Sequence, residues 1–337
     1  ASASHMSELL FAEAGRSVSP KTITRILKGA GLKNPFSHKG PRKRRRRARM
    51  ERFGQMLQID ASPFDWLSNG SMITLHGAID DATGSVTALR FERTECLDGY
   101  FHVLEETILS YGIPGSLYSD AHSIFFSPNP SKLSLTEELR GAGEGRTQFG
   151  KALEILGIKA LSPQAKGRIE RLWGTLQHRL VVDLRVAGVS TPEEANAFLA
   201  SYRTRHNDLF AVPPKDEATA FMPAPSKEDL ALILCRRVFR KMTGDSTVSW
   251  KGRKWSALDS QGRKVLFRKG VEVEVLNLLD GRTVLHHQGT FYELVRVEEE
   301  ETKKTLAKEN TTALSTEEGM RKPWTPGPDH PWKREYE

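Results

Sequence analysis

The sequence is short of cysteines, of metal-ligand spacings and of long apolar runs. Its two cysteines, Cys96 and Cys235, stand far apart among 337 residues. This excludes a disulfide framework and a Cys-x₂-Cys zinc site, and it predicts free thiols in a reducing compartment. The ten histidines form no zinc-finger spacing. No run of about 18 apolar residues occurs, so no membrane span is expected.

The length and composition indicate a soluble protein of several domains. A chain of 337 residues exceeds one compact core and predicts two or three domains. With 38% hydrophobic and 27% charged residues, the composition is that of a soluble globular protein. Residues 1–6, Ala-Ser-Ala-Ser-His-Met, resemble a cloning remnant and are left out of the predicted fold.

The positive charge is concentrated in one segment. Most of the net charge of +8 comes from a short run of basic residues: Arg42, Lys43, Arg44, Arg45, Arg46, Arg47 and Arg49. Such a run has no apolar face and its charges repel one another. Residues 37–52 are therefore predicted to form an extended arm that follows DNA phosphates. A solvated linker or a nuclear-import signal is the alternative.

The segment before the arm, residues 7–36, predicts a helix-turn-helix. Signals for a helix start at Ser19-Pro20 and a stop at Gly29–Gly31 bound the second helix. Residues 8–15 would supply the first. The predicted packing side consists of Ile23, Ile26 and Leu27, and the side predicted to contact DNA consists of Lys21, Thr22 and Arg25. Any basic amphipathic helix shows this pattern, so the arginine-rich arm that follows is what favours DNA binding.

Residues 53–222 predict a mixed α/β domain. Strand-like runs cover residues 56–60, 72–79, 86–91, 116–119 and 158–161, and helical patterns cover 98–111, 147–156 and the segment from 166 onward. The resulting order, βββαβαβα, is that of a ribonuclease-H-like core with a mixed five-stranded sheet.

Three carboxylates in this domain suggest a metal-dependent catalytic site. Asp60 and Asp120 end predicted strands, and Glu170 stands on a predicted helix. Carboxylates placed in this way can hold two divalent cations about 3.5–4 Å apart for in-line attack on a phosphodiester. Near the helix start, the candidate DNA contacts are Gln164, Lys166 and Arg168.

The pattern around Glu170 supports its role. A separate side of the predicted helix is apolar, with Ile169, Leu172, Leu176 and Leu180. Glu170 is therefore left to face a site, although an ordinary surface glutamate remains the alternative.

Several other side chains near the carboxylates have competing interpretations. Asp65 lies beyond the first predicted strand, and Asp80-Asp81 predict a turn before Gly84. Neither is preferred as a triad member. His122 could orient a phosphate or make a structural hydrogen bond, and Trp173 could contact DNA or only pack.

The C-terminal part has a different pattern. After a linker at residues 223–235, strand-like runs within residues 236–298 predict a small antiparallel barrel. The runs cover 247–250, 254–257, 264–268, 271–276, 283–287 and 290–297. Residues 299–337 form a tail whose proline-rich end predicts no folded structure of its own.

Several motifs together resemble a known family. They are Gly54-Gln-Met-Leu-Gln-Ile-Asp60, Asp65-Trp66, Gly77-Ala-Ile-Asp-Asp-Ala-Thr-Gly84, Thr147-Gln-Phe-Gly150, Ser162-Pro-Gln-Ala-Lys-Gly-Arg-Ile-Glu-Arg-Leu-Trp-Gly174, Ala211-Val-Pro-Pro214 and His330-Pro-Trp-Lys333. The block that ends at Glu170 is the most specific. The chain resembles bacterial insertion-sequence transposases of the DDE integrase-core type, an ISNCY-like group within the retroviral integrase superfamily.

The resemblance carries expectations about activity. It implies that Asp60, Asp120 and Glu170 are a catalytic triad that binds magnesium, with two ions expected and manganese as a substitute. It also implies an SH3-like barrel that binds DNA or another protomer. The expected reaction is DNA 3′-end cleavage at terminal inverted repeats and strand transfer into target DNA. We expect at least a dimer on DNA, in the bacterial cytoplasm and associated with the nucleoid.

Two other classes of function remain open. A ribonuclease-H-like nuclease would share the triad but would not need the helix-turn-helix, the basic arm and the barrel. A transposase-derived DNA-binding protein without catalysis would keep those flanking parts and tolerate loss of a carboxylate. The presence of all three carboxylates disfavours the second class.

Overall fold

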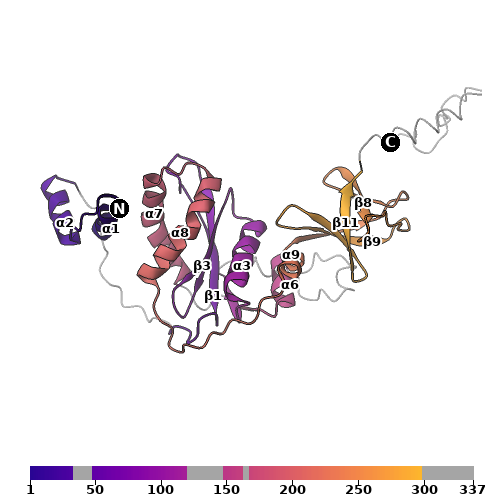
Figure 1. Cartoon of the computed structure of the whole chain (residues 1–337), viewed down its shortest axis with the longest axis horizontal. Coiled ribbons are helices and arrows are strands. Elements are labelled where there is room, and N and C mark those ends of the chain that lie inside the picture. Colours follow the sequence, from indigo (N-terminus) through magenta and orange to yellow (C-terminus); the bar gives the residue numbers. More distant parts are fainter. Residues whose placement is uncertain (33–47, 120–146, 162–166, 298–337) are drawn as a thin grey trace, which may run out of the picture. The chain divides into compact units, whose positions relative to one another are not determined.

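The computed structural model describes residues 1–32, 48–119, 147–161 and 167–297. The chain divides into two compact units (Figure 1). The first holds Ala1–Phe239 and Glu274–Gln288, and the second holds Arg240–Val273 and the chain from Gly289 onward. Both cysteines are free thiols, as the sequence predicts.

The first unit is built on a mixed five-stranded sheet. Its strands are β1 (Leu57–Phe64), β2 (Ile73–Asp80), β3 (Val86–Glu92), β4 (Ser116–Tyr118) and β5 (Lys159–Leu161), in the order β3-β2-β1-β4-β5. The pairs β1–β2 and β2–β3 are antiparallel, whereas β1–β4 and β4–β5 are parallel. This arrangement fits the ribonuclease-H-like core that the sequence predicts.

Helices cover both faces of this sheet. Figure 1 shows α3 (Leu97–Tyr111) on one face and the pair α7 (Ile169–Val186) and α8 (Pro192–Phe210) on the other. The short helix α6 (Gln148–Ile155) packs with α3 in one apolar cluster that includes Leu57 and Ile59 of β1. A second cluster joins β2 and β3 to α7 and α8. The sheet is therefore the middle layer between two hydrophobic cores.

The edge strand β3 is held by two asparagines of α8. Asn207 accepts from the Val86 amide at 2.8 Å and donates to its carbonyl at 2.9 Å. Asn196 binds the Phe91 backbone in the same way, at 2.8 and 3.1 Å. These side chains satisfy backbone groups that an edge strand would otherwise leave unpaired. They fix α8 along the edge of the sheet.

The first strand is longer than its sequence suggests. A strand ending at Asp60 is predicted, but β1 continues to Phe64. Its partner β2 runs antiparallel along the full length, with Phe64 opposite Ile73. Cross-strand pairing thus overrides the weak strand propensity of Ser62 and Pro63, and Asp60 lies in the middle of the strand.

The N-terminal segment forms two helices, α1 (Ala3–Ala14) and α2 (Pro20–Gly29), which contact each other. Helix α2 begins where the sequence predicts, because the Ser19 side chain accepts from the Thr22 amide at 3.2 Å. Helix α1 begins earlier than predicted and includes residues assigned to the cloning remnant. Of the expected packing side, Ile23 is buried but Ile26 is 59% exposed.

The linker at residues 223–235 contains a short helix, α9 (Lys227–Ile233). It is followed by a second sheet with strands β6 (Arg236–Lys241), β7 (Thr247–Trp250), β8 (Arg253–Leu258), β9 (Glu272–Asn277), β10 (Thr283–His287) and β11 (Thr290–Arg296). Their order is β6-β9-β10-β11-β8-β7. The strand predicted at residues 264–268 was wrong, since only Lys264 makes a bridge there, and β6 was missed.

Candidate active site

One face of β1 is joined to α7 by a row of hydrogen bonds. The Ile169 amide donates to Gln58 Oε1 at 3.1 Å, Trp173 Nε1 donates to Asp60 Oδ2 at 2.9 Å, and Gln177 Nε2 donates to Ser62 Oγ at 3.2 Å. Two residues of strand span about 6.7 Å and four residues of helix about 6 Å, so the spacings match. The alternation of β1 therefore places Asp60 under α7.

Asp60 owes its contact with Trp173 to a glycine. It lies half-buried on β1 opposite Gly77 of β2. A Cβ atom at position 77 would lie 2.9 Å from the Trp173 ring and 2.9 Å from Leu89. The indole thus occupies the space that a side chain at position 77 would fill. Trp173 is only 7% exposed, so it packs in the core and donates to Asp60, and its buried ring offers little surface to DNA.

Glu170 lies near the tryptophan that reaches Asp60, but its side chain is exposed, whereas the Trp173 ring is buried. It stands in the first turn of the helix, is exposed, and comes three residues before Trp173. Residues three apart are neighbours on a helix surface. The predicted apolar side is confirmed, because Ile169, Leu172, Leu176 and Leu180 are all buried. The structure thus places Asp60 on β1 in contact with α7, and Glu170 exposed in the first turn of that helix.

The Asp80-Asp81 pair forms the predicted turn. Both side chains are fully buried. Asp80 accepts from the Gly54 amide at 3.0 Å and from the amide and hydroxyl of Thr83 at 2.7 and 2.8 Å. Burial raises the pKa of Asp80. Its contacts close the turn and hold the chain before β1, and none of them reaches α7.

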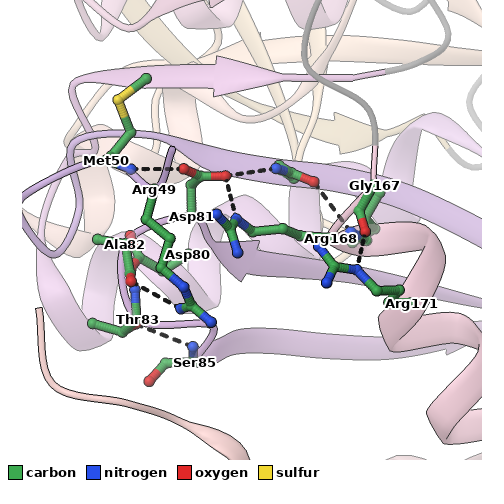
Figure 2. Close-up of polar contacts among 12 residues, drawn as sticks. Arg49, Met50, Asp80, Asp81, Ala82, Thr83, Ser85, Gly167, Arg168 and Arg171 are labelled. Carbon is green, nitrogen blue, oxygen red and sulfur yellow. Dashed lines mark hydrogen bonds and ion pairs between the residues drawn. The ribbon is translucent and has the colours of Figure 1, made fainter. Parts of the chain in front are cut away.

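Asp81 has partners different from those of Asp80, and the sequence did not reveal them (Figure 2). Its carboxylate accepts from the Met50 amide at 2.9 Å, from Gln58 Nε2 at 2.9 Å and from Arg168 Nε at 2.7 Å. These donors come from the end of the basic arm, from β1 and from the residue before α7. No sequence spacing links positions 50, 58, 81 and 168, so only the tertiary structure identifies this set.

Three arginines gather around the start of α7 (Figure 2). Arg49 is exposed and its Nη1 donates to the Ala82 carbonyl at 2.9 Å. Arg171 is also exposed and donates to the Gly167 carbonyl. Burial, and then the nearby Arg168, lower the pKa of Arg49. The Arg168 side chain is 13% exposed. The end of the basic arm therefore lies in the same positively charged region as Glu170.

Two curated proteins match the chain over most of its length. It is 30% identical to the transposase for insertion sequence IS1202 of Streptococcus pneumoniae over 364 aligned positions, which cover 98% of this chain and 75% of that protein. It is 34% identical to "Putative transposase y4bF" of Sinorhizobium fredii (strain NBRC 101917 / NGR234) over 284 positions, 82% of this chain and 59% of that protein. The chain belongs to the insertion-sequence transposases. The family named from the sequence motifs is thereby confirmed.

Solved structures resemble the transposase more remotely. A chain of the simian T-cell lymphotropic virus intasome, in complex with PP2A regulatory subunit B56 gamma, is 16% identical with a TM-score of 0.37, and covers 86% of this chain and 92% of its own. The magnesium complex of the HTLV-2 integrase catalytic core domain, in its dimeric form, is 17% identical with a TM-score of 0.31, over 43% and 83%. No protein-family model matches the transposase.

The remaining predicted site residues divide into two groups. Lys21 and Arg25 are exposed on α2, and the Thr22 hydroxyl lies 2.9 Å from Ser19 Oγ. The others lie outside the described residues: Arg42, Lys43, Arg44, Arg45, Arg46, Arg47, Asp120, His122, Gln164 and Lys166. Asp120 follows β4 by two residues, and Tyr118 at the end of β4 pairs in parallel with Gln58 of β1.

The donor set of the site suits a hard divalent cation. Asp60 and Glu170 offer carboxylate oxygens, the ligands that Mg²⁺ prefers in proteins. In the part of the chain that the structure describes, no group of three or more histidine, cysteine, aspartate or glutamate residues could hold a metal ion.

None of the described helices is long and apolar enough to span a membrane.

Proposed function

We propose that this transposase binds the terminal inverted repeats of an insertion sequence and catalyses 3′-end cleavage of DNA and strand transfer into target DNA. The reaction is a metal-dependent polynucleotidyl transfer. One observation carries the proposal: Trp173, one turn after Glu170 on α7, donates to Asp60 in the middle of the sheet. This contact supports a shared site for a carboxylate of the sheet and one of the helix.

Asp60, Asp120 and Glu170 would hold the divalent cations, which we expect to be two Mg²⁺ ions, with Mn²⁺ as a substitute. When bound, the metal supplies positive charge to the attacking and leaving oxygens of an in-line displacement at phosphorus. Trp173 orients Asp60 through its hydrogen bond. Glu170 is exposed at the surface that DNA would approach.

The flanking parts would place the DNA. We propose phosphate contacts by the arm residues 42–47, by Arg49 and by the residues before α7, Gln164, Lys166 and Arg168. The exposed Arg49 lies near Arg168 and Arg171 at the helix N-terminus, where positive charge favours phosphates. The helix pair α1–α2 would act as a helix-turn-helix, with Lys21, Thr22 and Arg25 toward DNA.

The six-stranded sheet would form an SH3-like barrel that binds DNA or another protomer. Joining two DNA ends to a target requires at least two copies of the site, so we propose a homodimer or larger assembly on DNA. This assembly would work in the bacterial cytoplasm at the nucleoid.

Cleavage and strand transfer on a labelled duplex that carries the element end test the proposal, with Mg²⁺ or Mn²⁺ present. Glu170→Gln should abolish products while DNA binding persists, a loss on the order of 10³-fold or about 4 kcal/mol. Glu193→Gln is the matched control, because Glu193 is exposed at the same position of the first turn of α8.

Each other outcome points elsewhere. Equal products from wild type and Glu170→Gln would move the catalytic glutamate to another position. Tight DNA binding with no products from the wild type would favour a transposase-derived binding protein. Equal cleavage of every duplex, with or without the element end, would favour a ribonuclease-H-like nuclease.

A further inference from the structure

The first turn of α7 has no local cap. Arg168 precedes the helix, and no side chain of the segment itself accepts from the first amides. Unpaired amides at a buried helix start are costly, so a partner must come from elsewhere in the fold. Gln58 supplies it from β1, because its Oε1 accepts from the Ile169 amide at 3.1 Å.

Gln58 is itself held by Asp81. The amide group of Gln58 is fully buried, and its Nε2 donates to Asp81 Oδ1 at 2.9 Å. The same Oδ1 accepts from Arg168 Nε at 2.7 Å. One carboxylate directly after β2 therefore holds the two residues at the start of α7: Arg168 directly, and Ile169 through Gln58.

Glu170 is the next residue after this attachment. We propose that Asp81, acting through Gln58 and Arg168, is a positioning residue that holds Glu170 in the place where it meets a divalent cation together with Asp60. This inference rests on the proposed function of Asp60 and Glu170. A carboxylate on a loose first turn would still reach the cation, but it would spend less time in the productive geometry.

The neighbouring aspartate provides a matched control. Asp80 has the same side chain and the same full burial, and it also accepts three hydrogen bonds, but its partners are Gly54 and Thr83 and neither lies on α7. Each variant therefore replaces one fully buried carboxylate of the same short segment with an amide. Asp80→Asn disturbs the turn through Thr83, whereas the bonds that Asp81→Asn weakens all lead away from the turn. Only Asp81→Asn removes the charge that faces Arg168.

The first experiment measures amide hydrogen exchange of the full chain by mass spectrometry, without metal or DNA. Asp81→Asn should raise exchange at least fivefold in peptides that cover the start of α7, whereas Asp80→Asn should raise it only around the turn at residues 80–85. Equal protection of α7 in both variants would overturn the proposal. This readout does not depend on activity.

The second experiment titrates strand transfer with Mn²⁺. Asp81→Asn should raise the half-maximal Mn²⁺ concentration about tenfold, and saturating Mn²⁺ should recover much of the rate. A purely structural role would lower the amount of active protein and leave that concentration unchanged. Asp80→Asn should leave the half-maximal Mn²⁺ concentration unchanged. The same half-maximal concentration in both variants would contradict the proposal.

A double-mutant cycle separates the positioning role of Asp81 from the proposed catalytic role of Glu170. If Asp81 acts through Glu170, Asp81→Asn should have no further effect on Mn²⁺-dependent residual activity or on Mn²⁺ binding in a Glu170→Gln background. Loss in Glu170→Gln with none in Asp81→Asn would sink the positioning role alone. Wild-type activity in both variants would sink the proposed function of Glu170 as well.

Discussion

The two faces of β1 carry different interactions although they belong to one strand. On the α3 face, Leu57 and Ile59 are fully buried in an apolar cluster. On the α7 face, Gln58, Asp60 and Ser62 make hydrogen bonds to the helix. The first face stabilises the core by burial, and the second fixes the candidate active site by directed bonds. Alternation along a single strand thus separates the apolar contacts of the core from the hydrogen bonds to α7.

This separation also explains why polar groups are tolerated beneath α7. A buried polar side chain is costly unless its hydrogen bonds are satisfied. Gln58 is fully buried and bonded at both ends of its amide, to Ile169 and to Asp81. Loss of either hydrogen bond would leave a buried polar group of Gln58 unpaired, and this cost opposes any shift of α7 along β1.

The largest effect is expected from truncation on the apolar face. Ile59→Ala should lower the free energy of unfolding of the core by about 3 kcal/mol, because it removes buried methyl groups and leaves a cavity. Strand transfer per folded molecule should be unchanged. Urea unfolding monitored together with the activity assay measures both.

Ser62→Ala is the control on the other face of β1. Its hydroxyl accepts a single bond from Gln177 at 3.2 Å, so we expect a loss of about 1 kcal/mol or less. A loss as large as that of Ile59→Ala would mean that the two faces do not differ in the way described.

A buried histidine on the α3 face, His76, is expected to make the stability of the core depend on pH. Burial lowers the pKa of His76 from 6.5 to about 4. The folded state therefore favours neutral imidazole, so its contribution to stability is complete above about pH 6.5 and is lost as pH falls toward 4. Between pH 7 and pH 5 we expect His76 alone to lower the free energy of unfolding by about 2 kcal/mol.

Unfolding curves at several pH values test this, with His76→Asn as the comparison. The variant should keep an acceptor near the Cys96 amide, which donates to His76 Nε2 at 3.2 Å, and should lose part of the pH dependence. His206, whose pKa burial also lowers to about 4, should supply much of what remains. Identical pH profiles would refute the role assigned to His76.

A smaller effect on stability than that of Ile59→Ala is expected at Gly77, on the α7 face. Gly77→Ala would place a Cβ atom 2.9 Å from the Trp173 ring and from Leu89, so the indole must move. We expect a loss of roughly 1–2 kcal/mol from overpacking. Strand transfer should fall about tenfold, equivalent to roughly 1.4 kcal/mol, because the hydrogen bond to Asp60 is weakened.

Gly99→Ala is the corresponding change on the α3 face. Its Cβ atom would lie 2.6 Å from the His76 ring. This variant should be less stable yet show normal strand transfer per folded molecule. If it lost activity as Gly77→Ala does, the α3 face would also control the site.

Much of the core could be predicted from local pattern. Alternation and turn residues placed β2 and β3 within one residue of their observed ends, and the apolar spacing from Ile169 to Leu180 marked the buried side of α7. The second sheet was predicted less well: β6 was missed and a strand was expected at 264–268. These runs are short, so pairing with neighbours decides them more than propensity does.

The sequence by itself determined the family, the order of strands and helices in the core, and the choice of Asp60, Asp120 and Glu170 as candidate catalytic residues. These properties depend on local spacing and on motifs that are continuous along the chain. Only the tertiary structure decided that Trp173 binds Asp60 over Gly77, and that Asp81 joins Gln58 and Arg168 at the start of α7. Such contacts join residues that are 23 to 113 positions apart, and hydrogen bonds between side chains at these separations leave no periodicity in the sequence.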